Sequence, residues 1–183
     1  MSEDKTKVLV LLGSLRAGSL NRQLAEVAVE NPPSGVEVSL YEGLGDVPLY
    51  NEDIDTADAP AAAVALRAAG GNADAVLVVT PEHNGTIPAA LKNAIDWLSR
   101  PYGSGALKGK PVAVIGSSLS SYGGKWAHDD ARKSFGIAGA AVVESSEFSV
   151  SSKVFDGRHP RENAEVTAKV REVLEKLIAD VSR

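Results

Sequence analysis

Short runs of apolar residues alternate with longer amphipathic segments along most of this chain. Four of the runs are continuous and of strand length: residues 8–12, 75–79, 112–115 and 140–143. Continuous apolar runs are typical of strands that are covered on both faces of a parallel sheet. A fifth segment, residues 36–41, alternates apolar with polar residues and therefore predicts a strand at the edge of that sheet.

Helical periodicity fills the segments between these strands. Apolar residues recur at helical spacing in four segments: 20–28, 87–98, 166–181 and, more weakly, 124–135. A further helix is predicted to start near Asp58 and Pro60 and to end at Gly70 and Gly71. The reason is that proline suits a first helical turn, whereas glycine suits a C-cap.

Five strands that alternate with five helices predict a doubly wound α/β domain, with a parallel sheet and helices on both faces. If the alternating strand lies at the edge, the strand order is 2-1-3-4-5. This is the flavodoxin-like arrangement, whose switch point lies between the first and third strands. The 183 residues contain no internal repeat or linker, so we expect residues 1–183 to form a single domain.

Composition excludes several classes of function. A net charge of -5 without a basic cluster disfavours a nucleic-acid partner. The chain has no cysteine, and its three histidines lack metal-ligand spacing, so neither a thiol nucleophile nor a metal site is predicted. The charged start MSEDKTK leads into only a short apolar run, too short for a signal-peptide core or a membrane span. We therefore expect a cytoplasmic protein with no membrane partner.

Three polar loops follow strands that the predicted order places side by side. The segment GSLRAGSLN follows the first strand, TPEHNGTIP follows the third, and SSLSSYGG follows the fourth. Ligands of open α/β sheets bind beyond the carboxyl ends of the strands, at the switch point. The three loops are therefore expected to meet in one binding site.

The first loop is similar to a P-loop that has lost its lysine. Two glycines stand five positions apart, but Ser19 occupies the place of the lysine that grips a nucleoside triphosphate. Backbone N–H groups at a helix N-terminus, the hydroxyls of Ser14 and Ser19, the amide of Asn21 and the charge of Arg16 suit a terminal monophosphate. For this loop taken alone, a capped turn with solvated polar side chains is the alternative.

The second loop carries groups that suit the edge of a flavin. Thr86 is predicted to cap the following helix, with Pro88 in its first turn. The peptide N–H groups of Asn84 and Gly85 would then point into the cleft, where the pyrimidine edge of a flavin needs donors. A positive helix end near that edge would stabilise an anionic reduced ring.

Four segments resemble the NADPH-dependent FMN reductase family, in particular its bacterial NAD(P)H quinone and chromate reductases. They are LLGSLRAGSLNRQLA, PLYNEDID, TPEHNGTIPAALKNAIDWLSRP and GSSLSSYGG. Together they cover nearly the whole chain in order and spacing, and the third is the most specific. The resemblance implies a flavodoxin-like fold that binds FMN, takes NAD(P)H as co-substrate and forms a homodimer or homotetramer.

The resemblance also implies which residues bind the cofactor. Five would hold the FMN phosphate: Ser14, Arg16, Ser19, Leu20 and Asn21. Five would border the isoalloxazine ring: Pro81, Glu82, His83, Asn84 and Gly85. Two would lie beside the ribityl chain and ring: Ser117 and Ser118. The family often has tyrosine at the place of His83, which here lines the flavin or caps the loop.

These residues predict an FMN-dependent NAD(P)H oxidoreductase. Hydride would pass from the nicotinamide to N5 of the flavin and on to a small acceptor, such as a quinone, free flavin, azo or nitro compound, or chromate. No catalytic side chain is predicted, because the cofactor carries the difficult chemistry. The alternative is a flavodoxin-type electron carrier that docks to protein partners, although a net charge of -5 is weak for its acidic surface.

Overall fold

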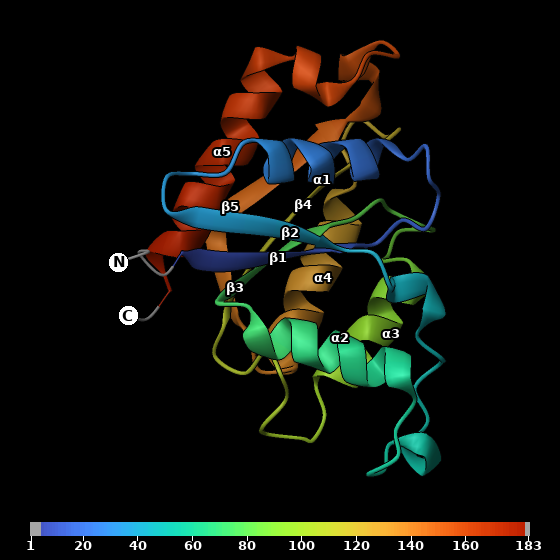
Figure 1. Cartoon of the computed structure of the whole chain (residues 1–183). Coiled ribbons are helices and arrows are strands. Elements are labelled where there is room, and N and C mark those ends of the chain that lie inside the picture. Colours follow the sequence, from blue (N-terminus) through green and yellow to red (C-terminus); the bar gives the residue numbers. More distant parts are fainter. Residues whose placement is uncertain (1–4, 182–183) are drawn as a thin grey trace.

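The computed structural model describes residues 5–181, in which a central five-stranded parallel sheet is covered by helices (Figure 1). The strands are β1 (Thr6–Leu12), β2 (Val36–Tyr41), β3 (Ala75–Val79), β4 (Pro111–Ser118) and β5 (Ala141–Ser151). Their order is β2-β1-β3-β4-β5, and every neighbouring pair is parallel. The predicted flavodoxin-like order is therefore confirmed. Residues 1–4, which belong to the charged start, lie outside the described residues.

Five helices form the two outer layers. They are α1 (Leu20–Glu30), α2 (Ala61–Asn72), α3 (Ala89–Leu98), α4 (Lys125–Ile137) and α5 (Ala164–Ala179). Helices α1 and α5 cover one face of the sheet, and α2, α3 and α4 cover the other (Figure 1). This division follows from the crossover connections, which must return each parallel strand across one face of the sheet.

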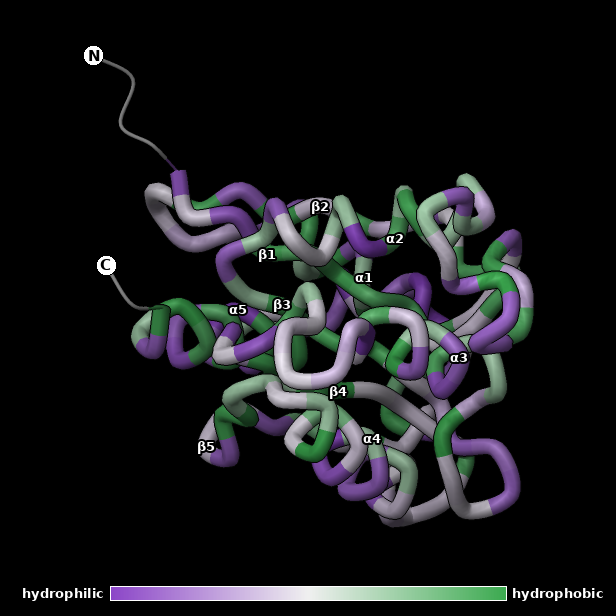
Figure 2. The backbone as a smooth tube through the Cα atoms, turned by 90° about the horizontal axis from the view of Figure 1, so that it is seen from below, coloured by the Kyte–Doolittle hydropathy of each residue, from purple (hydrophilic) through white to green (hydrophobic). Residues whose placement is uncertain are grey.

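Alternate residues of one strand serve two different cores. Val8 and Val10 of β1 are buried against α1 and α5, whereas Leu9 and Leu11 are buried against the helices of the opposite face. Successive side chains of a strand point to opposite faces, so a strand buried on both sides reads as a continuous apolar run. In Figure 2 the hydrophobic character of the inner strands appears as green segments.

The predicted end of α2 is wrong. Gly70 and Gly71 lie inside the helix and do not cap it. A Cβ on Gly70 would lie 3.0 Å from Cδ2 of Leu98, so this glycine allows close packing. The helix end is closed instead by Lys110, whose Nζ donates to the carbonyls of Gly70, Gly71 and Ala73 at 2.7, 2.6 and 2.6 Å. A cation at this end complements the helix dipole.

The fifth strand is longer than its apolar run predicts. The pairing register shifts between Val112 and Val114, where β5 carries extra residues in a bulge. β5 lies at the edge of the sheet, and Glu144, Ser145 and Glu147 in the bulge region are exposed, which explains the polar sequence there. Because Ser151 pairs with Ser118, the carboxyl end of β5 reaches the same edge of the sheet as the end of β4.

Candidate functional site

A crevice of about 260 Å³ opens where the loops after β1, β3 and β4 meet at the carboxyl edge of the sheet. It is lined by most of the residues expected from the sequence: Ser14, Arg16, Ser19, Leu20, Asn21, Pro81, Glu82, His83, Ser117 and Ser118. The expected Asn84 and Gly85 are not part of its wall and lie at the exposed tip of the second loop. The structure thus brings the three predicted loops into one site.

The first loop presents the N-terminus of α1 to the crevice. Ser19 is the N-cap, and its hydroxyl oxygen accepts a hydrogen bond from the backbone N–H of Asn21 at 3.1 Å. The hydroxyl hydrogen of Ser19 is not used in that bond. The first turn of α1 contains no acidic residue, and Arg16 is exposed beside it. This combination of a helix N-terminus, a hydroxyl and a cation suits an anion.

Asn21 joins the first loop to the third. Its Nδ2 donates to the carbonyl of Ser117 at 2.9 Å, and its Oδ1 accepts from the N–H of Ser117 at 2.8 Å. Both ends of this buried side-chain amide are therefore engaged within the protein. The resemblance implies a contact with phosphate, whereas the bonds seen here give Asn21 the task of holding two walls of the crevice together.

The hydroxyl of Ser117 has unused bonding capacity. Ser117 is 2% exposed and lines the crevice, yet its Oγ has no hydrogen-bond partner among the described residues. A buried polar atom without a partner costs about 1–3 kcal/mol, so such atoms are rare in native proteins. A ligand hydroxyl or phosphate in the crevice would supply the missing partner.

The tip of the second loop is a tight turn. The N–H of His83 donates to the carbonyl of Thr86 at 2.9 Å, and the N–H of Thr86 donates back to His83 at 3.1 Å. Asn84 and Gly85 have φ values of 53° and 79°. Two central residues with positive φ define a type I′ turn, for which Asn-Gly is the preferred pair. The turn leaves the N–H groups of these two residues at its tip.

The predicted N-cap of α3 is wrong. The N–H and carbonyl of Thr86 are both used in the turn, and α3 starts at Ala89 with Pro88 as N-cap and no side-chain cap. The conformational preference of Asn-Gly outweighs the capping preference of threonine. The Thr86 hydroxyl instead donates to Asp130, so the turn is fastened to α4.

Three residues at the site have no place in the sequence-based prediction. Leu119 and Ser152 line the crevice. Ser152 could not be predicted because the apolar run 140–143 does not indicate that β5 continues to Ser151. His128 does not line the crevice; it is completely buried, and burial lowers its pKa. Its signal was the spacing of the buried face of α4, which consists of Ala127, His128, Ala131, Arg132 and Phe135.

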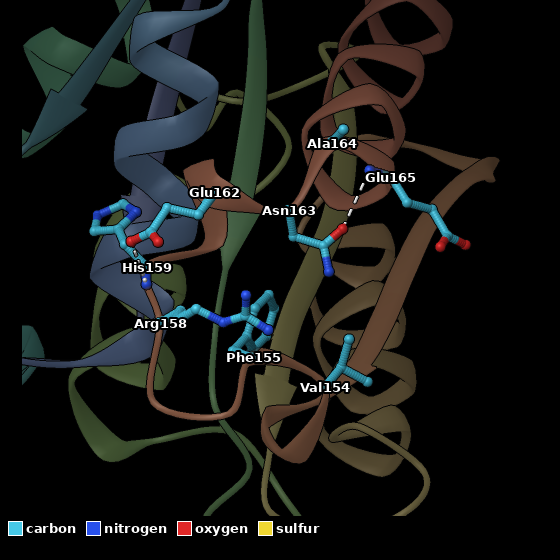
Figure 3. Close-up of a pocket in the computed structure, with 8 residues that line it drawn as sticks. All are labelled: Val154, Phe155, Arg158, His159, Glu162, Asn163, Ala164 and Glu165. Atoms are coloured by element: carbon cyan, nitrogen blue, oxygen red, sulfur yellow. Dashed lines mark hydrogen bonds between the residues drawn. The ribbon is translucent and has the colours of Figure 1, made fainter.

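A second pocket, of about 330 Å³, lies between the segment after β5 and the start of α5 (Figure 3). Three of its polar side chains, those of His159, Glu162 and Asn163, are already engaged. Nε2 of His159 is 3.2 Å from Oε2 of Glu26, and Glu162 accepts from the N–H of His159 at 3.3 Å. Asn163 caps α5 by accepting from Glu165 at 3.1 Å (Figure 3). These bonds stabilise the start of the helix, so we assign the functional site to the crevice.

Two further observations bear on the predicted class. Between residues 5 and 181, no group of three or more histidine, aspartate or glutamate side chains is arranged to hold a metal ion. Within the same range, no helix combines the length and the apolar character needed to cross a bilayer.

Comparison with known proteins supports the predicted family. A family model described as NADPH-dependent FMN reductase matches residues 6–154. A quinone reductase of Pseudomonas putida is 46% identical over 127 residues, covering 69% of this chain and 68% of that protein. A quinone reductase of Escherichia coli K12 is 40% identical over 149 residues, covering 81% of this chain and 78% of that protein.

Solved structures agree with these relatives. The chain is similar to FerB of Paracoccus denitrificans, a flavoenzyme NAD(P)H:(acceptor) oxidoreductase, with a TM-score of 0.82 and 32% identity over 96% of this chain and 98% of that chain. A flavodoxin from Pseudomonas aeruginosa shares the fold, with a TM-score of 0.59 and 23% identity over 94% of this chain and 99% of that chain. Because the family model spans more than half of the sequence, the chain belongs to the NADPH-dependent FMN reductase family.

Proposed function

We propose that this chain holds FMN in the crevice and reduces a quinone with electrons from NAD(P)H. The observation that carries the proposal is Ser117, a lining residue of the crevice whose buried hydroxyl has no partner among the described residues, in a chain of this family. When FMN is bound, its isoalloxazine ring supplies hydride and electron transfer. The protein then has to bind the cofactor, orient it and leave the ring accessible.

The phosphate end of FMN fits the first loop. The N-terminus of α1, the unused hydroxyl hydrogen of Ser19 and the guanidinium of Arg16 offer donors and positive charge to a dianion. Ser14 and Leu20 border the same wall. We assign Asn21 an indirect part, because its amide holds the backbone of Ser117 in place.

The remaining wall residues fit the rest of the cofactor. Pro81, Glu82 and His83 border the crevice on the side of the second loop, and we assign them to the isoalloxazine ring. Asn84 and Gly85 would meet the ring edge through the N–H groups at the tip of the turn. Ser117 and Ser118 would accompany the ribityl chain.

A quinone is the acceptor that the relatives favour. The proteins of Pseudomonas putida and Escherichia coli that are 46% and 40% identical are both named quinone reductase. A flat aromatic acceptor requires an accessible ring face, and His83 on the second loop is an exposed lining residue of the crevice. The flavodoxin-type carrier, which needs a protein partner instead, has no comparable support.

We also propose that the chain forms a homo-oligomer in the cytoplasm. Two exposed apolar side chains, Tyr102 and Ile137, border a groove of about 570 Å³ beside the C-terminal ends of α3 and α4. Exposed aromatic and aliphatic side chains in one groove are typical of a protein interface. Sedimentation should give a dimer or tetramer at micromolar concentration, and a strict monomer would contradict this part.

The function is tested by mixing the purified protein with FMN and then with reductant. We expect stoichiometric binding in a fluorescence titration, followed by rapid oxidation of NADH or NADPH when a benzoquinone is present. Stopped-flow reduction with each nucleotide would then define the preferred donor. Bound FMN that neither nucleotide reduces would overturn the proposal in favour of the electron carrier.

A further inference from the structure

His128 connects α4 to β5 and to the start of the loop after β3. The ring lies in the first turns of α4 and is completely buried. Its Nε2 is 2.9 Å from the carbonyl oxygen of Thr80, the residue that follows β3. Its Nδ1 is 2.6 Å from the hydroxyl oxygen of Ser149 on β5. Three separate elements therefore meet at one imidazole.

These contacts define the protonation of the ring. A carbonyl oxygen can only accept, so Nε2 must carry the hydrogen and donate it to Thr80. Burial lowers the pKa of His128, and the neighbouring Arg132 lowers it further, while Glu82, Asp129 and the bond to Thr80 act in the opposite direction. The ring is therefore neutral, and the Ser149 hydroxyl donates to Nδ1.

The Thr80 carbonyl is a critical point for the second loop. The next residue is Pro81, which has no N–H, so the peptide between them can be anchored only through its carbonyl. The close approach depends on Gly116, because a Cβ there would collide with the Thr80 carbonyl and lie 2.7 Å from Nε2 of His128. The backbone is thus shaped to let the imidazole reach this oxygen.

We propose that His128 is a positioning residue for the flavin site. By donating to the Thr80 carbonyl, it fixes the peptide from which the ring-binding loop departs, without itself lining the crevice. This role rests on the proposed function, since it concerns the geometry of the loop assigned to the isoalloxazine ring. Two further contacts join that loop to α4: Glu82 accepts from the N–H of Ala127 near the start of the loop, and the Thr86 hydroxyl donates to Asp130 after the turn.

Two variants separate positioning from simple core filling. His128→Leu fills the site but removes the donor, whereas His128→Gln retains an amide N–H that can reach the Thr80 carbonyl. We expect His128→Leu to weaken FMN binding by about tenfold or more, because the carbonyl loses its buried partner. His128→Gln should stay within about threefold of the unaltered protein. Urea unfolding of both apoproteins measures the structural cost separately.

Equal losses of FMN affinity in the two variants would overturn the proposal, and so would unaltered affinity in His128→Leu. If His128→Leu does not fold, the comparison of His128→Gln with the unaltered protein decides: a large loss would contradict the role of the donor. Nitrogen NMR of the unaltered apoprotein should show a neutral ring with hydrogen on Nε2, and hydrogen on Nδ1 alone would overturn it. Absence of FMN binding by the unaltered protein would refute the proposed function first, before any variant is compared.

Discussion

The crevice and the pocket before α5 differ in how their polar side chains are bonded. In the crevice at the carboxyl edge of the sheet, the buried Ser117 hydroxyl has no partner among the described residues. In the pocket before α5, His159, Glu162 and Asn163 are bonded to other parts of the protein. The crevice therefore still contains an unbonded polar group, whereas these three side chains of the other pocket already form bonds around the start of α5.

This difference in bonding shows that the volume of a pocket does not by itself identify the functional site. The pocket before α5, of about 330 Å³, is larger than the crevice, of about 260 Å³. A buried group without a partner is energetically costly, and within a binding site a ligand can supply the missing bond. Matched substitutions in the two pockets can test whether this distinction holds.

The largest effect should come from a methyl group at Gly116, next to the lining residue Ser117. In Gly116→Ala the new Cβ would meet the Thr80 carbonyl and lie 2.9 Å from Oδ1 of Asn21. We expect the free energy of unfolding to fall by about 3 kcal/mol or more, with loss of FMN binding. The measurements are urea unfolding of the apoprotein and fluorescence titration with FMN.

The matched change beside the other pocket is Gly157→Ala. Gly157 has a φ of 74° but open space around its Cβ position. The backbone conformation alone should cost about 1 kcal/mol, with unaltered FMN affinity. Normal FMN binding by a stable Gly116→Ala protein would show that the close approach at Gly116 is not needed for the site.

The architecture could be predicted from the chain, because its signals are local. Continuous apolar runs such as residues 75–79 indicate strands buried on both faces, and the alternating run 36–41 indicates an edge. The end of β5 was missed because an edge strand beyond a bulge carries polar residues. Local patterns thus identify the layers better than the limits of the elements.

The position of the site could also be predicted from local signals, but the hydrogen bonds that hold it together could not. The three polar loops are local features, and their meeting follows from strand order. The bond pair between Asn21 and Ser117 joins residues 96 apart in the chain, and the one between His128 and Thr80 joins residues 48 apart. At Thr86, the Asn-Gly turn and the capping preference compete, and sequence alone favoured the wrong one.

The next effect concerns charge. Arg16 and Arg158 are both exposed arginines, one on the wall of the crevice and one on the wall of the other pocket. We expect Arg16→Ala to weaken FMN binding by about 10- to 100-fold, the value of a charge-assisted bond to phosphate. Arg158→Ala should leave FMN binding unaltered. Equal titration curves for the two variants would refute the assignment of phosphate to the first loop.

Two helix caps give a finer comparison. Ser19 caps α1 in the crevice, and Asn163 caps α5 in the other pocket. Alanine at either position should lower the free energy of unfolding by about 1 kcal/mol. Only Ser19→Ala should also weaken FMN binding, by about five- to tenfold, because its hydroxyl hydrogen is proposed to reach the phosphate. Loss of affinity in Asn163→Ala would show that the two helix starts are coupled.

The smallest effect is the most specific test of unused bonding capacity. Ser117 and Ser146 are both buried serines, but Ser146 donates to the carbonyl of Val173 at 2.7 Å, whereas Ser117 Oγ has no partner among the described residues. Ser146→Ala should cost about 1 kcal/mol of apoprotein stability and leave FMN binding unaltered. Ser117→Ala should leave the stability of the apoprotein unaltered, because the hydroxyl that it removes has no partner there. It should weaken FMN binding by about threefold, because the holoprotein loses one hydrogen bond. Urea unfolding with and without FMN measures both quantities, and destabilised Ser117→Ala apoprotein would mean that the hydroxyl already has a partner within the protein.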